Sequence, residues 1–102
     1  MRYLLLPSAG GVKNISDALN DRHYEVIVPT DFKEFLKYYG VAYTIIGAGE
    51  LTTDGVFAWG YARGKGKRVI ALKGVTPCLV SQTITLANLL KEIPTQNLLW
   101  SP

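Results

Sequence analysis

The sequence has one cysteine, Cys78, and one histidine, His23, and it contains no long hydrophobic run. A lone thiol cannot form an internal disulfide, and no Cys and His cluster exists to hold zinc, so we expect no metal and a reducing, cytoplasmic location. No apolar stretch approaches the roughly 20 residues that cross a bilayer. The three leucines before Pro7 are too few for a signal-peptide core and indicate a first strand instead.

The excess of positive charge is small, with 11 lysines and arginines against 8 acidic residues. A net charge of +3 is compatible with an anionic small molecule such as a nucleotide, but it is too small to indicate nucleic acid. Apolar residues make up 48% of the chain and charged residues 19%, as in ordinary folded proteins. A chain of 102 residues without a low-complexity linker predicts one domain over residues 1–102.

Strand-like and helix-like segments alternate along the chain. Short apolar runs bounded by glycine and proline predict five strands, at Tyr3–Leu6, Tyr24–Val28, Val41–Ile46, Arg68–Leu72 and Asn97–Trp100. Apolar residues at helical spacing predict four helices, around Ile15–Leu19, Asp31–Gly40, Asp54–Gly64 and Ile84–Ile93. Asn14 or Ser16 is expected to cap the first helix, and Asp31 with Glu34 forms a capping box at the second.

This alternation predicts a parallel sheet that is covered by helices on both faces. Ligands of such sheets bind beyond the carboxyl ends of the strands, at the point where the strand order reverses. Four loops would line that site in this chain: Pro7–Gly11, Pro29–Asp31, Gly47–Asp54 and Lys73–Pro77.

Two glycine pairs follow predicted strands, and neither completes a known phosphate-binding motif. After Gly47 and Gly49, Thr52 occupies the third glycine position of a dinucleotide fingerprint, and no acid follows at the required distance. Gly10 and Gly11 lack the Gly-Lys-Ser/Thr ending of a P-loop. A looser inference remains, because glycines let a ligand approach the backbone near a helix N-terminus, which favours anions.

The predicted third helix combines small and aromatic residues in an unusual way. Gly60 and Gly64 lie four residues apart, as do Ala58 and Ala62, so two faces of the helix allow a close approach. A glycine inside a helix costs stability, and Gly60 therefore indicates contact with a strand, a ligand or another subunit. Lys65, Lys67 and Arg68 follow this helix, where cations offset the negative end of the helix dipole.

Residues Gly55–Ala62, followed by Gly66–Leu72, resemble the nucleoside 2-deoxyribosyltransferase family. The family motif runs roughly D-x-G-T-A-x-E-x-G-Y-A and then x-x-x-G-K-x-V-x-A, and the chain shares the Gly-Tyr-Ala, the spacing to Gly-Lys and the following strand. Tyr3–Pro7 is similar to the first strand of the family. Ala87–Leu90 resembles a late Asn-Leu-Met element, which in those enzymes reaches the site of a neighbouring subunit.

The resemblance implies a flavodoxin-like, Rossmann-like three-layer sandwich with a five-stranded parallel sheet, assembled as a homodimer or higher oligomer. It also implies cleavage of an N-glycosidic bond by a glutamate nucleophile, whose position Ala58 occupies here. A methyl group cannot attack an anomeric carbon, and glycosyl transfer typically needs two carboxylates. Asp54 approximately matches the assisting aspartate of the family, although it could equally be the cap of its helix. Glu50 falls near an acid that contacts the base.

We therefore interpret the chain as a protein that binds a nucleoside, a nucleotide or an ADP-ribose-like molecule without a cofactor, and whose glycosidic chemistry is lost or altered. The expected ligand contacts are Ser8, Gly10, Gly11, Gly47, Gly49, Phe57, Ala58, Trp59, Tyr61 and Asn88. In this interpretation the strand-end residues bind phosphate and the aromatic residues stack on a base, although Ser8 could instead cap a helix and Trp59 could point into the core.

Two alternatives of other classes remain. The first is an active N-glycoside transferase or hydrolase that uses Glu50 and Asp54. The second is a protein-interaction module without a ligand, which would carry a sizeable exposed apolar patch.

Overall fold

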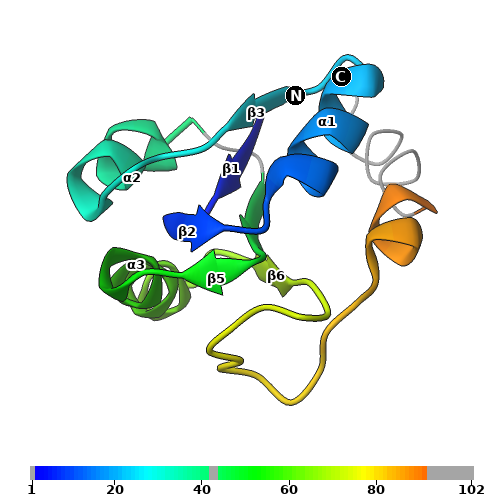
Figure 1. Cartoon of the computed structure of the whole chain (residues 1–102). Helices are drawn as coiled ribbons and strands as arrows, with labels where there is room; N and C mark the ends of the chain where they lie inside the picture. Colours follow the sequence, from blue (N-terminus) through cyan, green and yellow to red (C-terminus); the bar gives the residue numbers. More distant parts are fainter. Residues whose placement is uncertain (1, 42–43, 92–102) are drawn as a thin grey trace.

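A parallel sheet of four strands forms the centre of the computed structural model, which describes residues 2–41 and 44–91. The strands are β1 (Arg2–Leu5), β3 (Glu25–Ile27), β4 (Thr44–Gly47) and β6 (Val69–Ala71), in the order β3-β1-β4-β6 (Figure 1). Each neighbouring pair is parallel, as the alternation of elements predicted. The fifth predicted strand, Asn97–Trp100, lies outside the described residues.

Helices cover both faces of the sheet, because successive strand residues point to opposite sides. Leu4 and Ile45 pack with α2 and α3, whereas their neighbours Leu5 and Ile46 pack with α1 and the last helical segment. The helices are α1 (Lys13–Asp21), α2 (Phe32–Tyr39), α3 (Thr53–Gly64) and the described segment 86–91. In the part of the chain that the structure describes, no helix is both long and apolar enough to cross a membrane. The mixed α/β class with two helical layers is thus confirmed.

Two further strands form where the sequence predicted only loops. β2 (Ser8–Gly10) pairs antiparallel with β5 (Glu50–Leu51) at the carboxyl end of the parallel sheet. Both strands are only two or three residues long, and Leu51 is their single large apolar residue, so they are too short to show the apolar alternation that reveals a half-buried strand. Their pairing depends on the parallel sheet, which brings the ends of β1 and β4 side by side.

The helix starts differ from the predicted caps in two places. Val12 precedes α1 and makes no side-chain cap, so the assignment of Asn14 or Ser16 as the cap was wrong. At α2 the Asp31 carboxylate accepts a hydrogen bond from the Glu34 amide at 2.7 Å, which confirms one arm of the capping box. The Glu34 carboxylate accepts instead from the Thr30 hydroxyl at 3.1 Å.

Pro7, Thr52 and Gly55 form the joint between the sheet and α3. The Pro7 carbonyl accepts from the Thr52 amide at 3.3 Å, and the Thr52 hydroxyl accepts from the Gly55 amide at 3.2 Å. Thr52 is therefore the cap of α3, and Asp54 is not. A Cβ atom at Gly55 would lie 2.1 Å from the Pro7 carbonyl oxygen, so the joint requires glycine there.

Alanine substitutions at Gly55 and Gly60 of α3 should have opposite effects on stability. Gly55→Ala places a methyl group on the Pro7 carbonyl, and such overpacking should cost about 1–3 kcal/mol or more. A Cβ at Gly60 meets no atom within 4 Å, so Gly60→Ala should stabilise the chain by about 0.5–1 kcal/mol through helix propensity. Urea unfolding of dilute protein, followed by circular dichroism, measures both, and equal effects would contradict this packing.

Candidate functional site

The structure brings the four predicted loops together at the carboxyl end of the sheet. Residues 7–11 and 47–54 meet through the pairing of β2 with β5. Residues 73–77 join them, because the Leu51 amide donates to the Thr76 carbonyl at 2.7 Å and the Thr76 amide donates to the Gly49 carbonyl at 2.9 Å. The turn before α2 joins as well, because the Phe32 amide donates to the Asp54 carboxylate at 2.9 Å.

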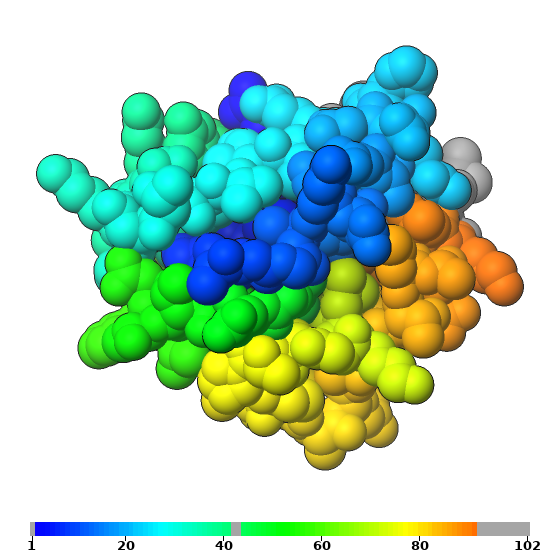
Figure 2. Space-filling model, viewed as in Figure 1, coloured from blue at the N-terminus to red at the C-terminus, as the bar shows by residue number. Residues whose placement is uncertain are grey.

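The strand-end glycines allow two segments of the chain itself to approach each other. Gly49 has φ +67°, and a Cβ there would lie 2.1 Å from the Gly10 carbonyl oxygen. Gly11 has φ +80°, and its Cβ would lie 3.0 Å from the Gly49 Cα atom. In the space-filling view the blue surface of residues 7–11 adjoins the green surface of residues 49–55 (Figure 2). The close approach of the two backbone segments therefore explains glycine at both positions, with or without a ligand.

A small cavity of about 170 Å³ lies beside this crossing, on the α1 side of the sheet. Its walls come from the ends of three sheet strands, the start of α1 and the last helical segment. They comprise Gly11, Asn14, Ile15, Ala48, Gly49, Leu72, Lys73 and Leu86. The cavity lies between the continuations of β1 and β4, where the strand order reverses, which is the place that such sheets use for ligands.

Groups that attract anions surround this cavity. No side chain caps α1, and the amides of Lys13, Asn14 and Ile15 have no acceptor among the described residues. Free amides and the helix dipole at a helix start attract anions. Lys73 adds a full charge to the cavity wall. An anionic group of modest size is therefore the ligand that this arrangement favours.

The two acidic residues and Ser8 occupy different environments. The Glu50 side chain is exposed and makes no hydrogen bond or ion pair within the part of the chain described here. Asp54 is half-buried and holds the first amide of α2. The Ser8 hydroxyl oxygen is buried and has no partner among residues 2–41 and 44–91. The two carboxylates do not form a hydrogen-bonded pair.

Ala58 and Trp59 lie in the hydrophobic core rather than at the surface. Their exposed fractions are 0% and 1%, and both pack with Leu4 and Ile45 against the sheet. A Cβ at Gly47 would lie 3.1 Å from the Leu6 Cδ1 atom and in ordinary contact, at 3.7 Å, with the Trp59 ring, so the tight neighbour of Gly47 is Leu6. The interpretation of Trp59 as a core residue agrees with this burial. The Trp59 ring also borders a hollow of about 310 Å³, together with Arg63, Lys67 and Arg68.

The other aromatic residues of α3 pack toward α2. Tyr61 contacts Phe32 and Tyr39 edge to face, with ring centroids 5.6 and 5.2 Å apart, and Phe57 lies 6.3 Å from Phe32. The Lys67 ammonium donates to the Tyr39 carbonyl at 2.6 Å and lies 4.4 Å from the centre of its ring. Desolvation lowers the pKa of Lys67. Burial, reinforced by the neighbouring Tyr61, raises the pKa of Tyr39.

The predicted phosphate contacts and base contacts do not form one pocket within a single chain. Phe57 and Tyr61 lie on the face of the sheet that α2 and α3 cover, whereas the small cavity opens on the α1 face. Asn88 is exposed on the segment 86–91, which also lies on the α1 face. Its backbone amide donates to the Thr85 hydroxyl at 3.2 Å.

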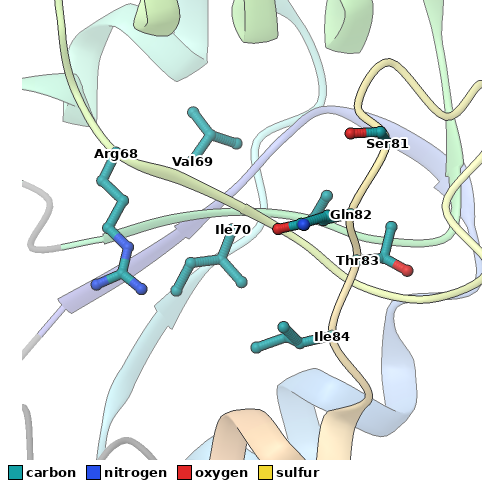
Figure 3. A pocket seen from close by; sticks show the side chains of 8 residues that line it. Arg68, Val69, Ile70, Ser81, Gln82, Thr83 and Ile84 are labelled. Carbon is teal, nitrogen blue, oxygen red and sulfur yellow. The ribbon is translucent and has the colours of Figure 1, made fainter.

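A larger groove of about 650 Å³ runs along β6 and was not foreseen from the sequence. Arg68, Val69 and Ile70 line one side (Figure 3). The facing segment supplies Ser81, Gln82, Thr83 and Ile84 (Figure 3). The Ile84 amide donates to the Ala71 carbonyl at 3.0 Å, so this segment covers the last part of the β6 edge. A polar stretch without periodicity gave no sign of this groove in the sequence.

Comparison of the chain with models of known protein families found no match. Comparison with the curated proteins also found none. The resemblance of residues 55–72 to nucleoside 2-deoxyribosyltransferases therefore stays a prediction. Among the described residues, no group of three His, Cys, Asp or Glu side chains is placed to hold a metal ion.

Two neighbouring lysines should differ in their effect on stability. Lys67→Met removes the hydrogen bond to the Tyr39 carbonyl and the contact with its ring, and we expect a loss of about 1 kcal/mol. Lys65→Met is the matched control, because Lys65 is exposed and lies 5.7 Å from the Tyr61 ring centre. Its effect should stay within about 0.5 kcal/mol. Equal losses in urea unfolding would refute a structural role for Lys67.

Proposed function

We propose that this protein binds a phosphate-bearing, nucleotide-like small molecule through the cavity at the start of α1. The observation that carries the proposal is the meeting of uncapped α1 amides, glycine-rich strand ends and Lys73 around one cavity. Backbone amides at a helix start and a lysine are the groups that bind phosphate in many α/β proteins. The location at the reversal of strand order supports the same function.

The volume of the cavity limits which part of the ligand it can hold. At about 170 Å³ it is smaller than the roughly 300–1,000 Å³ of pockets that enclose a drug-sized ligand. A phosphate fits such a space, and a whole nucleoside does not. The base of a bound nucleotide would therefore lie outside the cavity, and Phe57 and Tyr61 are not positioned to stack on it.

Binding without cleavage is the function we favour over N-glycosidic catalysis. Ala58 stands at the position of the family nucleophile, and its methyl group is buried in the core. Asp54 already accepts a hydrogen bond from the α2 backbone. Glu50 is exposed to solvent and lacks a partner carboxylate in the described part of the chain. These features support binding without cleavage, on a scaffold that the resemblance predicts to be similar to nucleoside 2-deoxyribosyltransferases but without their catalytic pair.

The proposal includes a five-stranded, flavodoxin-like sheet. In the described residues β6 is an edge strand, and its first half faces the groove of Figure 3. A fifth strand next to β6 would extend the sheet order in the flavodoxin-like manner. The groove of about 650 Å³ supports this layout, because an added strand would need space beside Val69.

Nucleotides should bind more tightly than the matching nucleosides, and Lys73→Ala should remove most of the difference. We expect the variant to bind nucleoside monophosphates about tenfold more weakly, the loss of one charge-assisted contact. Lys91→Ala is the control, because Lys91 is an exposed lysine outside the cavity wall. Isothermal titration calorimetry measures the affinities. Equal affinity for nucleosides and nucleotides would contradict a phosphate site.

The same ligands distinguish binding from catalysis. After incubation, mass spectrometry should recover the bound molecule intact, with free base at the level of a protein-free control. Glu50→Gln should change neither result, because Glu50 takes no part in binding. Release of free base that Glu50→Gln abolishes would replace the binding function with N-glycosidic cleavage.

A second candidate function has an observation of its own. Phe57 has an exposed fraction of 67%, and an apolar hollow lies beside it on the outer side of α3. An exposed apolar patch of this kind marks interaction surfaces on soluble proteins. A protein-interaction function through α3 is compatible with ligand binding, because the two surfaces lie on opposite faces of the sheet.

A further inference from the structure

The hollow beside Trp59 lies at the opposite end of the sheet from the cavity at the start of α1. It has a volume of about 310 Å³ and lies where α3 ends and β6 begins. Trp59 and Arg63 of α3 form one part of its wall, and Val69 and Val80 form an apolar part. Its volume is at the lower end of the roughly 300–1,000 Å³ of pockets that enclose small organic molecules. A molecule of a few carbon atoms fits this space.

The Trp59 indole carries a buried N–H group without an acceptor. Its Nε1 atom has no hydrogen-bond partner among residues 2–41 and 44–91, and the whole residue is only 1% exposed. Native structures rarely leave a buried donor unpaired, because the group has lost its water without a replacement. The Cζ3 atom, on the other edge of the ring system, lies near Gly47, so the Nε1 edge turns away from that strand end. An acceptor in the adjoining hollow would satisfy this N–H group.

Arg63 adds a positive charge next to this donor. It follows Trp59 by four residues, so the two side chains lie on the same side of α3. The Arg63 guanidinium makes no hydrogen bond or ion pair within the described part of the chain. The hollow therefore offers a neutral donor and a charged fork of donors that the fold does not use.

The two other cations of the wall point elsewhere. The Lys67 ammonium donates to the Tyr39 carbonyl at 2.6 Å and is held there. The Arg68 side chain extends on the same side of β6 as Ile70, away from Val69 (Figure 3). Arg63 is thus the cation with which a ligand of this hollow would pair.

Neighbouring negative groups do not compete with a ligand for Arg63. Residues 55–91 contain no aspartate and no glutamate. The carbonyls at the end of α3 are satisfied as well, because the amides of Gly66 and Lys67 donate to the carbonyls of Arg63 and Ala62, each at 3.0 Å. This closed turn reduces the repulsion that the negative end of a helix dipole would exert on an anion.

We propose that the hollow binds a small organic carboxylate with a short aliphatic body. The carboxylate accepts hydrogen bonds from the Arg63 guanidinium and from Trp59 Nε1, and the aliphatic body contacts Val69 and Val80. A guanidinium can hold a carboxylate through two parallel hydrogen bonds. Phosphate carries more charge and no apolar atoms, so it would lose more hydration and gain nothing from the valine walls. This ligand differs from that of the α1 cavity, and the two bind independently.

Titration of the Trp100→Phe variant with isovalerate tests the proposal. The chain has two tryptophans, so Trp59 then gives the only indole N–H signal in a ¹⁵N–¹H spectrum. Isovalerate should shift this signal in a saturable manner, with a dissociation constant of roughly 1 mM or lower, because the N–H group gains an acceptor. Calorimetry on the unaltered chain should give the same constant, which detects any effect of Trp100→Phe itself. Isovaleramide, which has the same body without the charge, should bind at least about tenfold more weakly.

Two lysines outside the wall of the hollow provide the controls. In the Trp100→Phe background, Arg63→Met should raise the dissociation constant for isovalerate at least about tenfold. Lys65→Met should leave the constant unchanged, because Lys65 is an exposed cation at the same end of α3 but does not line the hollow. Lys73→Ala should also leave it unchanged, which separates this site from the α1 cavity.

Three results would overturn the proposal. The first is the absence of a saturable shift of the Trp59 signal with isovalerate. The second is equal weakening by Arg63→Met and Lys65→Met, which would indicate general attraction of anions to a basic surface. The third is tighter binding of inorganic phosphate than of isovalerate with the same shift, which would assign the hollow to phosphate instead.

Discussion

The Pro7 carbonyl is the contact on which the arrangement of the carboxyl end depends. It accepts the Thr52 amide, while the Thr52 hydroxyl caps α3 through the Gly55 amide. A side chain at Gly55 would collide with the same carbonyl. Because this joint sets where α3 begins, it also sets where Asp54 meets α2 and where β5 meets β2.

From this joint the two faces of α3 take different roles. The buried face places Ala58 and Trp59 against the sheet, and Tyr61 reaches sideways to α2. The aromatic residues that suggested base stacking therefore hold two helices together, since their rings contact each other rather than an open pocket. On the outer face the Phe57 ring touches Phe32 but stays largely exposed, and a Cβ at Gly60 would meet nothing within 4 Å.

The candidate site and the candidate interface lie on opposite sides of the sheet. The cavity beside α1 combines free amides with Lys73, which suits a small anion, whereas the hollow on α3 is apolar and suits a side chain. The two candidate surfaces therefore differ in chemistry and share no lining residue. A ligand at α1 and a partner at α3 could bind at the same time without competing for residues.

The sequence by itself determined the parallel α/β class, the helical layers and the loops that meet at the strand ends. Apolar periodicity and helix caps such as Asp31 are local signals, and they act over a few residues. The sequence did not reveal the pairing of β2 with β5, because these strands are too short to show an alternating pattern. It also did not reveal that Thr52, rather than Asp54, caps α3.

Only the tertiary structure decided which faces of α3 are buried and why its glycines differ. Gly55 packs against the carbonyl of Pro7, between β1 and β2, whereas Gly60 is exposed, yet both are glycines of one helix. The same holds for Trp59 and Phe57, of which one is buried and the other exposed. Such differences depend on backbone contacts between segments some 45 positions apart, such as that of Thr52 with Pro7, which no local pattern of residues encodes.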